Sequence, residues 1–184
     1  SGSGKTTLLN IMSGLLKPTS GTVFVEGSDI YSLSTSERDD IRLNRIGMIF
    51  QEHSLIVDFT VRENVELILR VRGFGSRSRV MAIEALERVG IAHLQDRYPR
   101  QLSGGEAQRV GIARAIAGDR PILLADEPTG QLDRRNSQMV FELLRALAED
   151  EKGRTVVLSS HDPTAKEYAH RSCELVDGHL EDSC

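Results

Sequence analysis

The first seven residues of the chain could bind phosphate. Their order, Ser-Gly-Ser-Gly-Lys-Thr-Thr, matches the second half of the phosphate-loop pattern G-x-x-x-x-G-K-[ST]. Glycines let backbone N–H groups approach phosphate oxygens, and a helix N-terminus favours negative charge. In such a loop Lys5 reaches the β- and γ-phosphates, and the Thr6 hydroxyl binds Mg²⁺. The candidate phosphate-binding residues are Ser1, Gly2, Ser3, Gly4, Lys5, Thr6 and Thr7. A flexible Gly/Ser leader is the alternative, but the apolar helix expected directly after Lys5 argues against it.

Two acids follow a short apolar run. The run at 122–125 predicts a strand, and Asp126 and Glu127 come directly after it. Ligands of open α/β sheets bind beyond the carboxyl ends of the strands. Asp126 could therefore hold Mg²⁺, and Glu127 could act on the water that attacks a γ-phosphate. Pro128 disfavours helical geometry at Glu127, which would keep its carboxylate extended toward the site. The alternative is a strand followed by an acidic helix cap.

Further polar residues stand at the ends of predicted elements. Gln51 follows a strand at 45–50, His161 follows a strand at 155–159, and Asp133 precedes a helix at 134–148. Each also has a plain structural interpretation: a polar strand end, a structural histidine or a helix N-cap. Ser103, Gly104 and Gly105 open another helix, and a helix N-terminus can bind an anion.

Helices and strands alternate along the chain, which predicts an α/β fold. Capping boxes of the form S/T-x-x-E predict helices that begin after Ser34, Thr60 and Ser103. Further helices are predicted at 4–16, 80–89 and 134–148, and strands at 22–26, 45–50, 122–125, 155–159 and 173–176. The short apolar strands indicate a mainly parallel sheet covered on both faces. Residues 1–184 would form one domain, in which 1–51 and about 115–184 build the core and about 52–114 a helical subdomain.

Composition excludes several classes of protein. A chain of 184 residues with 39% hydrophobic residues suits one domain. The net charge is −4 and the basic residues are scattered, so no nucleic-acid partner is expected. Two cysteines, Cys173 and Cys184, indicate a reducing compartment. No apolar run approaches the roughly 20 residues of a membrane span, and the start of the chain does not look like a signal peptide. Any link to a membrane would then run through a partner.

The segment Leu-Ser-Gly-Gly-Glu at 102–106, followed by Gln108 and Arg109, resembles the signature of ABC ATPases. With Gln51 before it and the other motifs after it, the resemblance covers the whole chain. It implies a P-loop NTPase core of the RecA-like type, with an inserted helical subdomain. It also implies that Gln51 is the Q-loop glutamine, which senses Mg²⁺ and the attacking water and couples them to a membrane subunit. His161 would contact the γ-phosphate. Residues 130–133 would be the D-loop that crosses a dimer interface.

The same resemblance implies a cofactor, partners and a location. ATP and Mg²⁺ would bind between two copies arranged head to tail, with Ser103, Gly104, Gly105 and Asp133 of one copy facing the phosphate loop of the other. The partners would be integral membrane transporter subunits (a permease) and a second ATPase copy, at the cytoplasmic face of a membrane. The segment 126–133 resembles the group that serves lipoprotein release, macrolide export and cell division. The cargo would be chosen by the membrane subunits.

Two other functions stay open at this stage. One is an ATPase that acts on nucleic acid or ribosomes, and the other is a non-catalytic remnant or assembly partner. The second arises because the first glycine of the phosphate-loop pattern, the strand that delivers the loop and an adenine-stacking aromatic residue would all precede Ser1. On that interpretation we expect one unpaired strand edge, poor stability and weak ATP binding.

Overall fold

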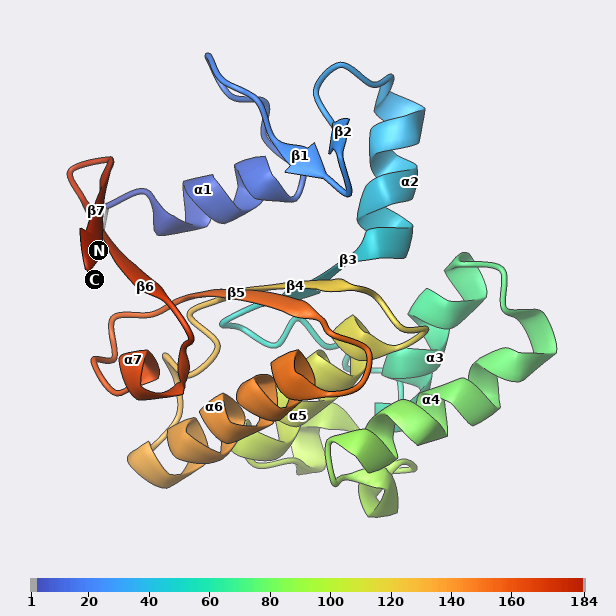
Figure 1. Ribbon diagram of the computed structural model, residues 1–184. Coiled ribbons are helices and arrows are strands. Elements are labelled where there is room, and N and C mark those ends of the chain that lie inside the picture. Colours follow the sequence, from blue (N-terminus) through green and yellow to red (C-terminus); the bar gives the residue numbers. More distant parts are fainter. Residues whose placement is uncertain (1–2, 184) are drawn as a thin grey trace.

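A three-stranded parallel sheet lies at the centre of the computed structural model, which describes residues 3–183 (Figure 1). The strands are β3 (Ile46–Ile49), β4 (Ile122–Asp126) and β5 (Thr155–Ser159), in the order β3-β4-β5. Ile49 pairs with Ala125, and Asp126 pairs with Ser159. The carboxyl ends of all three strands therefore meet at one edge of the sheet. On its other side β5 pairs with no described strand.

Alternate residues of the strands belong to two hydrophobic cores, one on each face of the sheet. Leu123 and Ala125 pack into the larger core with α3 to α6, whereas Ile122 and Leu124 face the smaller core beside Leu9. Successive side chains of a strand point to opposite faces, which explains the division. Figure 1 shows α1 and α2 above the sheet and α5 and α6 below it. The mainly parallel, doubly covered α/β fold is confirmed.

The helices α1 to α6 agree with the predicted positions to within a few residues, whereas the short helix α7 was not predicted. In chain order they are α1 (Lys5–Met12), α2 (Thr35–Arg45), α3 (Val61–Val71), α4 (Ser78–Arg88), α5 (Gly104–Ile116), α6 (Arg134–Glu149) and α7 (Ala165–Tyr168). Short 3₁₀ turns are η1 (Gly75–Arg77), η2 (Ala92–Leu94) and η3 (Pro99–Gln101). All three capping boxes are formed, at Ser34, Thr60 and Ser103. Each one pairs two otherwise unsatisfied groups and thereby fixes the first residue of its helix.

The strands at the two ends of the chain form hairpins outside the parallel sheet. Two short strands, β1 (Phe24–Val25) and β2 (Ser28–Asp29), pair antiparallel, and so do β6 (Ser172–Val176) and β7 (His179–Ser183). The expectation that 173–176 is a buried strand of the parallel sheet was wrong. Asp177 and Gly178 both have positive φ, of 48° and 80°, as the tight turns of two-residue hairpins require. The turn sends β7 back along β6, and β6 is largely exposed.

The helical segment 61–116 shares its core with the sheet. Val65 of α3 and Leu86 of α4 belong to the same buried cluster as Ile49 and Leu123 of the strands. The predicted division into a core and a helical subdomain stays a prediction. None of the described helices combines the length and the apolar character needed to cross a membrane.

Candidate active site

The site is built where β4 and β5 end side by side. The Ser159 hydroxyl donates a hydrogen bond to Oδ1 of Asp126 at 2.7 Å. The backbone N–H of Glu127 reaches Ser159 twice, its Oγ at 3.2 Å and its carbonyl oxygen at 3.1 Å. Ser159, which is buried, therefore fixes both acids. Sequence reasoning gave Ser159 no role, although its place at the end of a strand beside 122–126 was a usable signal.

Glu127 avoids right-handed helical geometry, as expected before Pro128, but by an unusual route. Its φ is +46°, in the left-handed region. A proline disfavours the right-handed helical region at the residue before it, and here the backbone bonds to Ser159 select the left-handed region instead. A non-glycine residue in this region costs of order 1–3 kcal/mol and persists only where its surroundings hold it. Such residues cluster at functional sites.

The Glu127 carboxylate joins two other candidate residues. Its Oε2 lies 2.7 Å from Nδ1 and 3.2 Å from the backbone N of His161, and its Oε1 lies 3.7 Å from Nζ of Lys5. The Glu127 side chain is only 14% exposed, whereas the His161 side chain is 69% exposed. Lys5, in the first turn of α1, and His161, after β5, thus converge on the carboxylate of Glu127, which follows β4.

The phosphate loop precedes α1 directly. Gly4 caps this helix with a φ of 94°, a conformation that glycine adopts without strain. Lys5 Nζ also lies 3.4 Å from the Ser3 hydroxyl. The first turn of α1 contains no acidic residue, so its free N–H groups remain suited to an anion. Thr6 and Thr7 are exposed on this turn. The predicted residues Ser1 and Gly2 lie outside the described part of the chain.

Gln51 is brought to the same region by the loop that follows β3. It is exposed, and a Cβ added at Gly130 would lie 2.8 Å from its Nε2. Gly130 belongs to the segment that follows Glu127, and its N–H donates to the Glu127 carbonyl at 3.1 Å. The Gln51 side chain therefore packs against the loop that carries Glu127.

The Ser103 segment packs against the start of α6. A Cβ on Gly105 would meet Oδ1 of Asn136 at 2.6 Å. Asp133 caps α6 by accepting from the backbone N of Asn136 at 2.9 Å, and this bond is the main reason that the pKa of Asp133 lies below its usual value. Asp133 is therefore an N-cap, as the structural interpretation expected. In the described part of the chain no hydrogen bond or ion pair joins residues 103–105 to residues 3–7.

The donors expected to hold Mg²⁺ are suited to it. Among the described residues, no cluster of three or more His, Cys, Asp or Glu side chains forms a protein-only metal cage. Magnesium instead prefers one or two carboxylates together with substrate phosphates and water. Ser159 donates to Oδ1 of Asp126. No described residue donates a hydrogen bond to Oδ2, so this oxygen is available to a metal ion. Thr6 and Gln51 add a hydroxyl and an amide oxygen.

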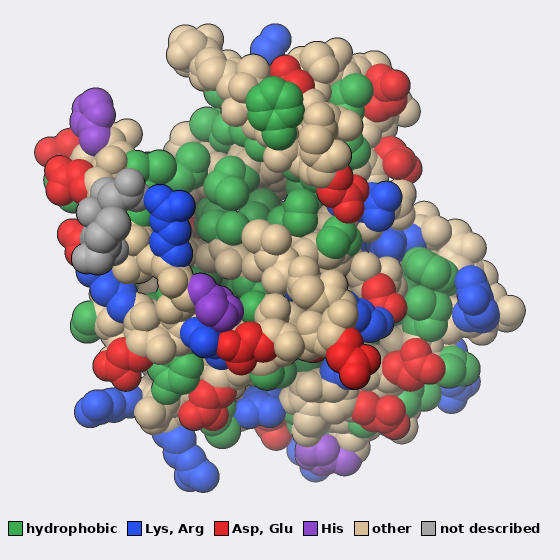
Figure 2. Space-filling view, in the orientation of Figure 1, with side chains coloured by type: hydrophobic (Ala, Val, Ile, Leu, Met, Phe, Trp, Pro, Cys, Tyr) green, Lys and Arg blue, Asp and Glu red, His purple; other side chains and the backbone are tan. Residues whose placement is uncertain are grey.

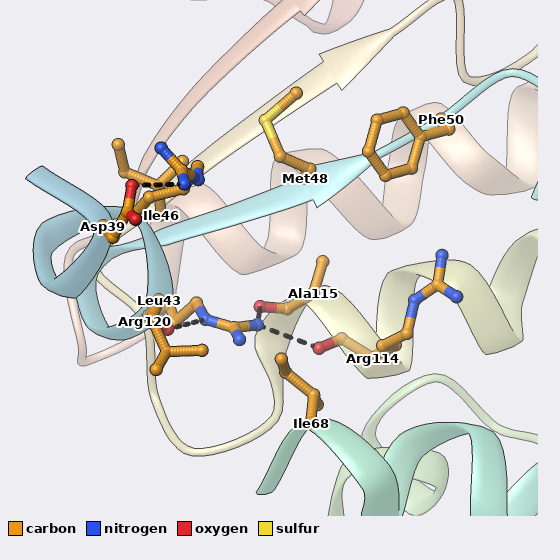
Figure 3. A pocket seen from close by; sticks show the side chains of 10 residues that line it. Asp39, Leu43, Ile46, Met48, Phe50, Ile68, Arg114, Ala115 and Arg120 are labelled. Atoms are coloured by element: carbon orange, nitrogen blue, oxygen red, sulfur yellow. Dashed lines mark hydrogen bonds and ion pairs between the residues drawn. The ribbon is translucent and has the colours of Figure 1, made fainter. Parts of the chain in front are cut away.

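Two pockets in the described structure contain none of these candidate residues. One, of about 420 Å³, lies between α2, β3 and α5 and includes Met48, Arg114 and Arg120 (Figure 3). The other, of similar volume, lies between β1 and the sheet, where Figure 2 shows hydrophobic side chains gathered on the visible face. The candidate site at the carboxyl edge of the sheet is separate from both of these pockets.

Comparison with known proteins now identifies the arrangement. The family model described as "ABC transporter" matches residues 1–130. The lipoprotein-releasing system ATP-binding protein LolD of Blochmanniella floridana is 45% identical over 181 residues, which cover 98% of this chain and 77% of that protein. This chain belongs to the ABC transporter family.

As a member of that family it is similar to further ATP-binding proteins. The ABC transporter ATP-binding protein MJ0796 of Methanocaldococcus jannaschii is 43% identical over 189 residues, or 98% of this chain and 79% of that protein. A solved dimeric structure of the MJ0796 cassette in a post-hydrolysis state, bound to ADP and Pi, matches with a TM-score of 0.86 at 40% identity. It covers 98% of this chain and 81% of that one. The predicted P-loop NTPase fold of an ABC ATP-binding subunit is thereby confirmed.

Proposed function

We propose that this ABC subunit hydrolyses Mg²⁺-ATP at the carboxyl edge of β4 and β5. The observation that supports this best is the Glu127 carboxylate, which contacts both Lys5 and His161. A largely enclosed acid, 14% exposed, beside a phosphate-binding lysine is placed to polarise the attacking water as general base or orienting group. His161 then contacts the γ-phosphate. Lys5 exchanges its contact with Glu127 for the β- and γ-phosphates, which frees the carboxylate for water.

The remaining site residues bind and orient the nucleotide. Asp126, Thr6 and Gln51 hold Mg²⁺, which when bound neutralises charge on the β- and γ-phosphates. Gln51 also senses the attacking water. The residues of the loop, Ser1, Gly2, Ser3, Gly4, Lys5, Thr6 and Thr7, surround the phosphates with N–H groups and with the N-terminus of α1. Because Ser159 fixes both Asp126 and Glu127, it keeps the metal ligand and the water-activating acid in a constant relation.

We infer that two copies complete the site. Ser103 and Gly104 are exposed at the N-terminus of α5, where N–H groups can bind an anion. A second copy placed head to tail would bring Ser103, Gly104, Gly105 and Asp133 against the ATP on Lys5. The dimeric structures of the MJ0796 cassette support this arrangement.

Hydrolysis in the dimer would drive membrane subunits. Several of the most similar relatives bear the name of lipoprotein-releasing ATP-binding proteins, which supports lipoprotein, lipid, peptide or drug extraction or export. The subunit would then sit at the cytoplasmic face of a membrane, held by its permease. We propose that residues 1–51 and about 115–184 form the nucleotide-binding core and that about 52–114 form the helical subdomain with the signature motif, while Gln51 couples the nucleotide to the membrane subunit.

Two variants test this proposal. Glu127→Gln should bind ATP and dimerise but release phosphate at least about 100-fold more slowly than the unchanged chain. Ser103→Arg should keep nucleotide binding in the monomer and lose turnover, because the substituted side chain would block the second copy. Phosphate release, binding of a fluorescent ATP analogue and light scattering measure the three properties. Full turnover by Ser103→Arg would exclude the shared site, and full turnover by Glu127→Gln would exclude the role of that acid.

A further inference from the structure

The loop that carries Gln51 is held by the helix that begins after Ser103. Oε1 of Gln108, in α5, lies 2.5 Å from Nδ1 of His53. Nε2 of the same amide donates to the carbonyl oxygen of Phe50 at 3.5 Å. Gln108 is fully buried. One amide therefore contacts the loop on both sides of Gln51.

The chemistry of this contact fixes the orientation of the groups. Since Nε2 of Gln108 faces a carbonyl oxygen, Oε1 faces the imidazole, and Nδ1 of His53 must be the donor. An apolar side chain of the same size at position 108 would leave the ring N–H of His53 and the Phe50 carbonyl without their Gln108 partners. Because this removes the hydrogen bonds that tie the loop to α5, the loop would then shift.

Arg114 continues the contact nearly two turns further along α5. Its Nη2 donates to the His53 carbonyl at 2.8 Å and its Nη1 to the Ser54 carbonyl at 2.6 Å. Gly111 lies between Gln108 and Arg114 on the helix, and a Cβ on Gly111 would lie 3.8 Å from the His53 carbonyl oxygen. Positions 108, 111 and 114 follow a spacing of three and form one ridge on the helix. Figure 3 shows the Arg114 side chain directed from α5 toward the Phe50 end of β3.

The backbone of the loop depends on these partners. His53 and Ser54 have positive φ, of 28° and 48°, which non-glycine residues keep only where the surroundings hold them. At its other end the loop is located by Gln51, whose amide packs on Gly130. The loop thus spans two supports, α5 and the segment that follows Glu127.

We propose that Gln108 and Arg114 are positioning residues that join the Gln51 loop to the Ser103 helix as one rigid unit. The 13-residue helix α5 carries Ser103 at its N-cap, and Gln108 lies about 7.5 Å along the axis from it. Movement of Ser103 when a second copy docks therefore moves Gln51 at the nucleotide. This inference rests on the proposed function, because hydrolysis in a dimer is what gives the linkage its consequence.

The test compares Gln108→Leu, Gln108→Glu and His53→Ala with a control, Gln138→Leu, on the exposed side of α6. In Gln108→Leu we expect kcat to fall about tenfold or more, while the Kd for a fluorescent ATP analogue stays within about twofold. Gln108→Glu keeps an acceptor for His53 but loses the donor to the Phe50 carbonyl, so it should recover only part of kcat. Gln108→Leu combined with His53→Ala should cost no more than the larger single loss, since both changes break one contact.

Hydrogen exchange provides a readout that does not need turnover. Amides 52–56 should exchange faster in Gln108→Leu than in the unchanged chain, and at the unchanged rate in Gln138→Leu. Unchanged exchange in a folded Gln108→Leu, a kcat within about twofold of the original, or fully multiplicative losses in the double variant would overturn the inference. Should Gln108→Leu not fold, His53→Ala and Arg114→Lys carry the same measurements. A chain without any ATPase activity would refute the proposed function instead, and exchange would still decide the linkage.

Discussion

One carboxylate oxygen of Glu127, Oε2, accepts hydrogen bonds from both the ring Nδ1 and the backbone N–H of His161, at 2.7 and 3.2 Å. The double contact fixes the imidazole because Nδ1 must carry the proton, which leaves Nε2 for contact with substrate. The acid proposed to activate water, Glu127, and the histidine proposed to face the γ-phosphate, His161, therefore orient one another.

Removing the imidazole should impair turnover more than binding. We expect His161→Ala to lower kcat by about 100-fold, because both the γ-phosphate contact and the orientation of Glu127 are lost. The matched control is His170→Ala, another exposed histidine whose ring lies beside a carboxylate, that of Glu149. Steady-state phosphate release, measured at ATP concentrations from below KM up to saturation, distinguishes an effect on kcat from an effect on KM. Equal activity of the two alanine variants would contradict the assignment.

Two glycines of α5 should respond differently to alanine. A Cβ on Gly105 would lie 2.6 Å from Asn136, whose side chain is tied to Asp133, whereas a Cβ on Gly111 meets its nearest atom at 3.8 Å. Gly105→Ala should therefore destabilise the fold by about 1–3 kcal/mol through overpacking. Gly111→Ala should be neutral or stabilise by up to about 1 kcal/mol through helix propensity. Urea unfolding measures both, and an equal effect at the two positions would refute the difference.

Arg120 should contribute strongly to stability. Its guanidinium is buried and donates to the carbonyls of Leu43, Arg114 and Ala115, each at 3.0 Å (Figure 3). Burial lowers the pKa of Arg120 to about 10, so the group stays charged at neutral pH. Arg120→Met should lower the free energy of unfolding by about 3 kcal/mol, because the carbonyls lose a charged donor. Arg79→Met, at an exposed position of α4, is the control. A loss no larger than that of the control would contradict this prediction.

Acid should weaken the three capped helices. Hydrogen bonds from Ser34, Thr60 and Ser103 hold the pKa values of Glu37, Glu63 and Glu106 below the usual 4.5. A carboxyl with a lowered pKa in the folded state stabilises the fold above its unfolded pKa, and the contribution is lost as pH falls through the folded pKa. We therefore expect stability to decline from about pH 5 downward.

A triple variant tests whether these three glutamates cause the loss of stability in acid. In it, Glu37, Glu63 and Glu106 are each replaced by glutamine. Glutamine also completes a capping box, so helix starts are kept while the titrating groups are removed. The unfolding free energy of the triple variant should depend less steeply on pH below about 5 than that of the unchanged chain. The unfolding free energy would be measured by urea unfolding at several pH values. If it falls with pH equally steeply in both proteins, other titrating groups dominate the pH dependence of stability.

Local features of this sequence were predictable, whereas contacts across the chain were not. The capping boxes at Ser34, Thr60 and Ser103 fix helix starts with residues three apart, and the strand at 155–159 was found at its observed bounds. The contact of His53 with Gln108 joins residues 55 apart, and no local pattern contains it. The positive φ of Glu127 depends in the same way on Ser159, in another strand.

The hairpin at the end of the chain was missed for a different reason. Residues 172–176 have strand character, but periodicity does not tell which strand will be the neighbour. The Asp-Gly pair at 177–178 is a strong hairpin signal and would have indicated an antiparallel partner in 179–183. The candidate site residues were recognisable from the sequence for two reasons. They follow predicted strands or open predicted helices, and their residue types and order resemble the motifs of ABC ATPases.

The alternation of β4 between two cores has a consequence for how this chain can change over evolutionary time. Adding or deleting one residue between Ile122 and Asp126 would exchange every side chain between the faces. It would also rotate Asp126 and Glu127 away from Ser159. Length variation in descendants of this sequence should therefore avoid β4 and accumulate in exposed turns such as 75–77 or 151–153, which lie outside both the sheet and the site.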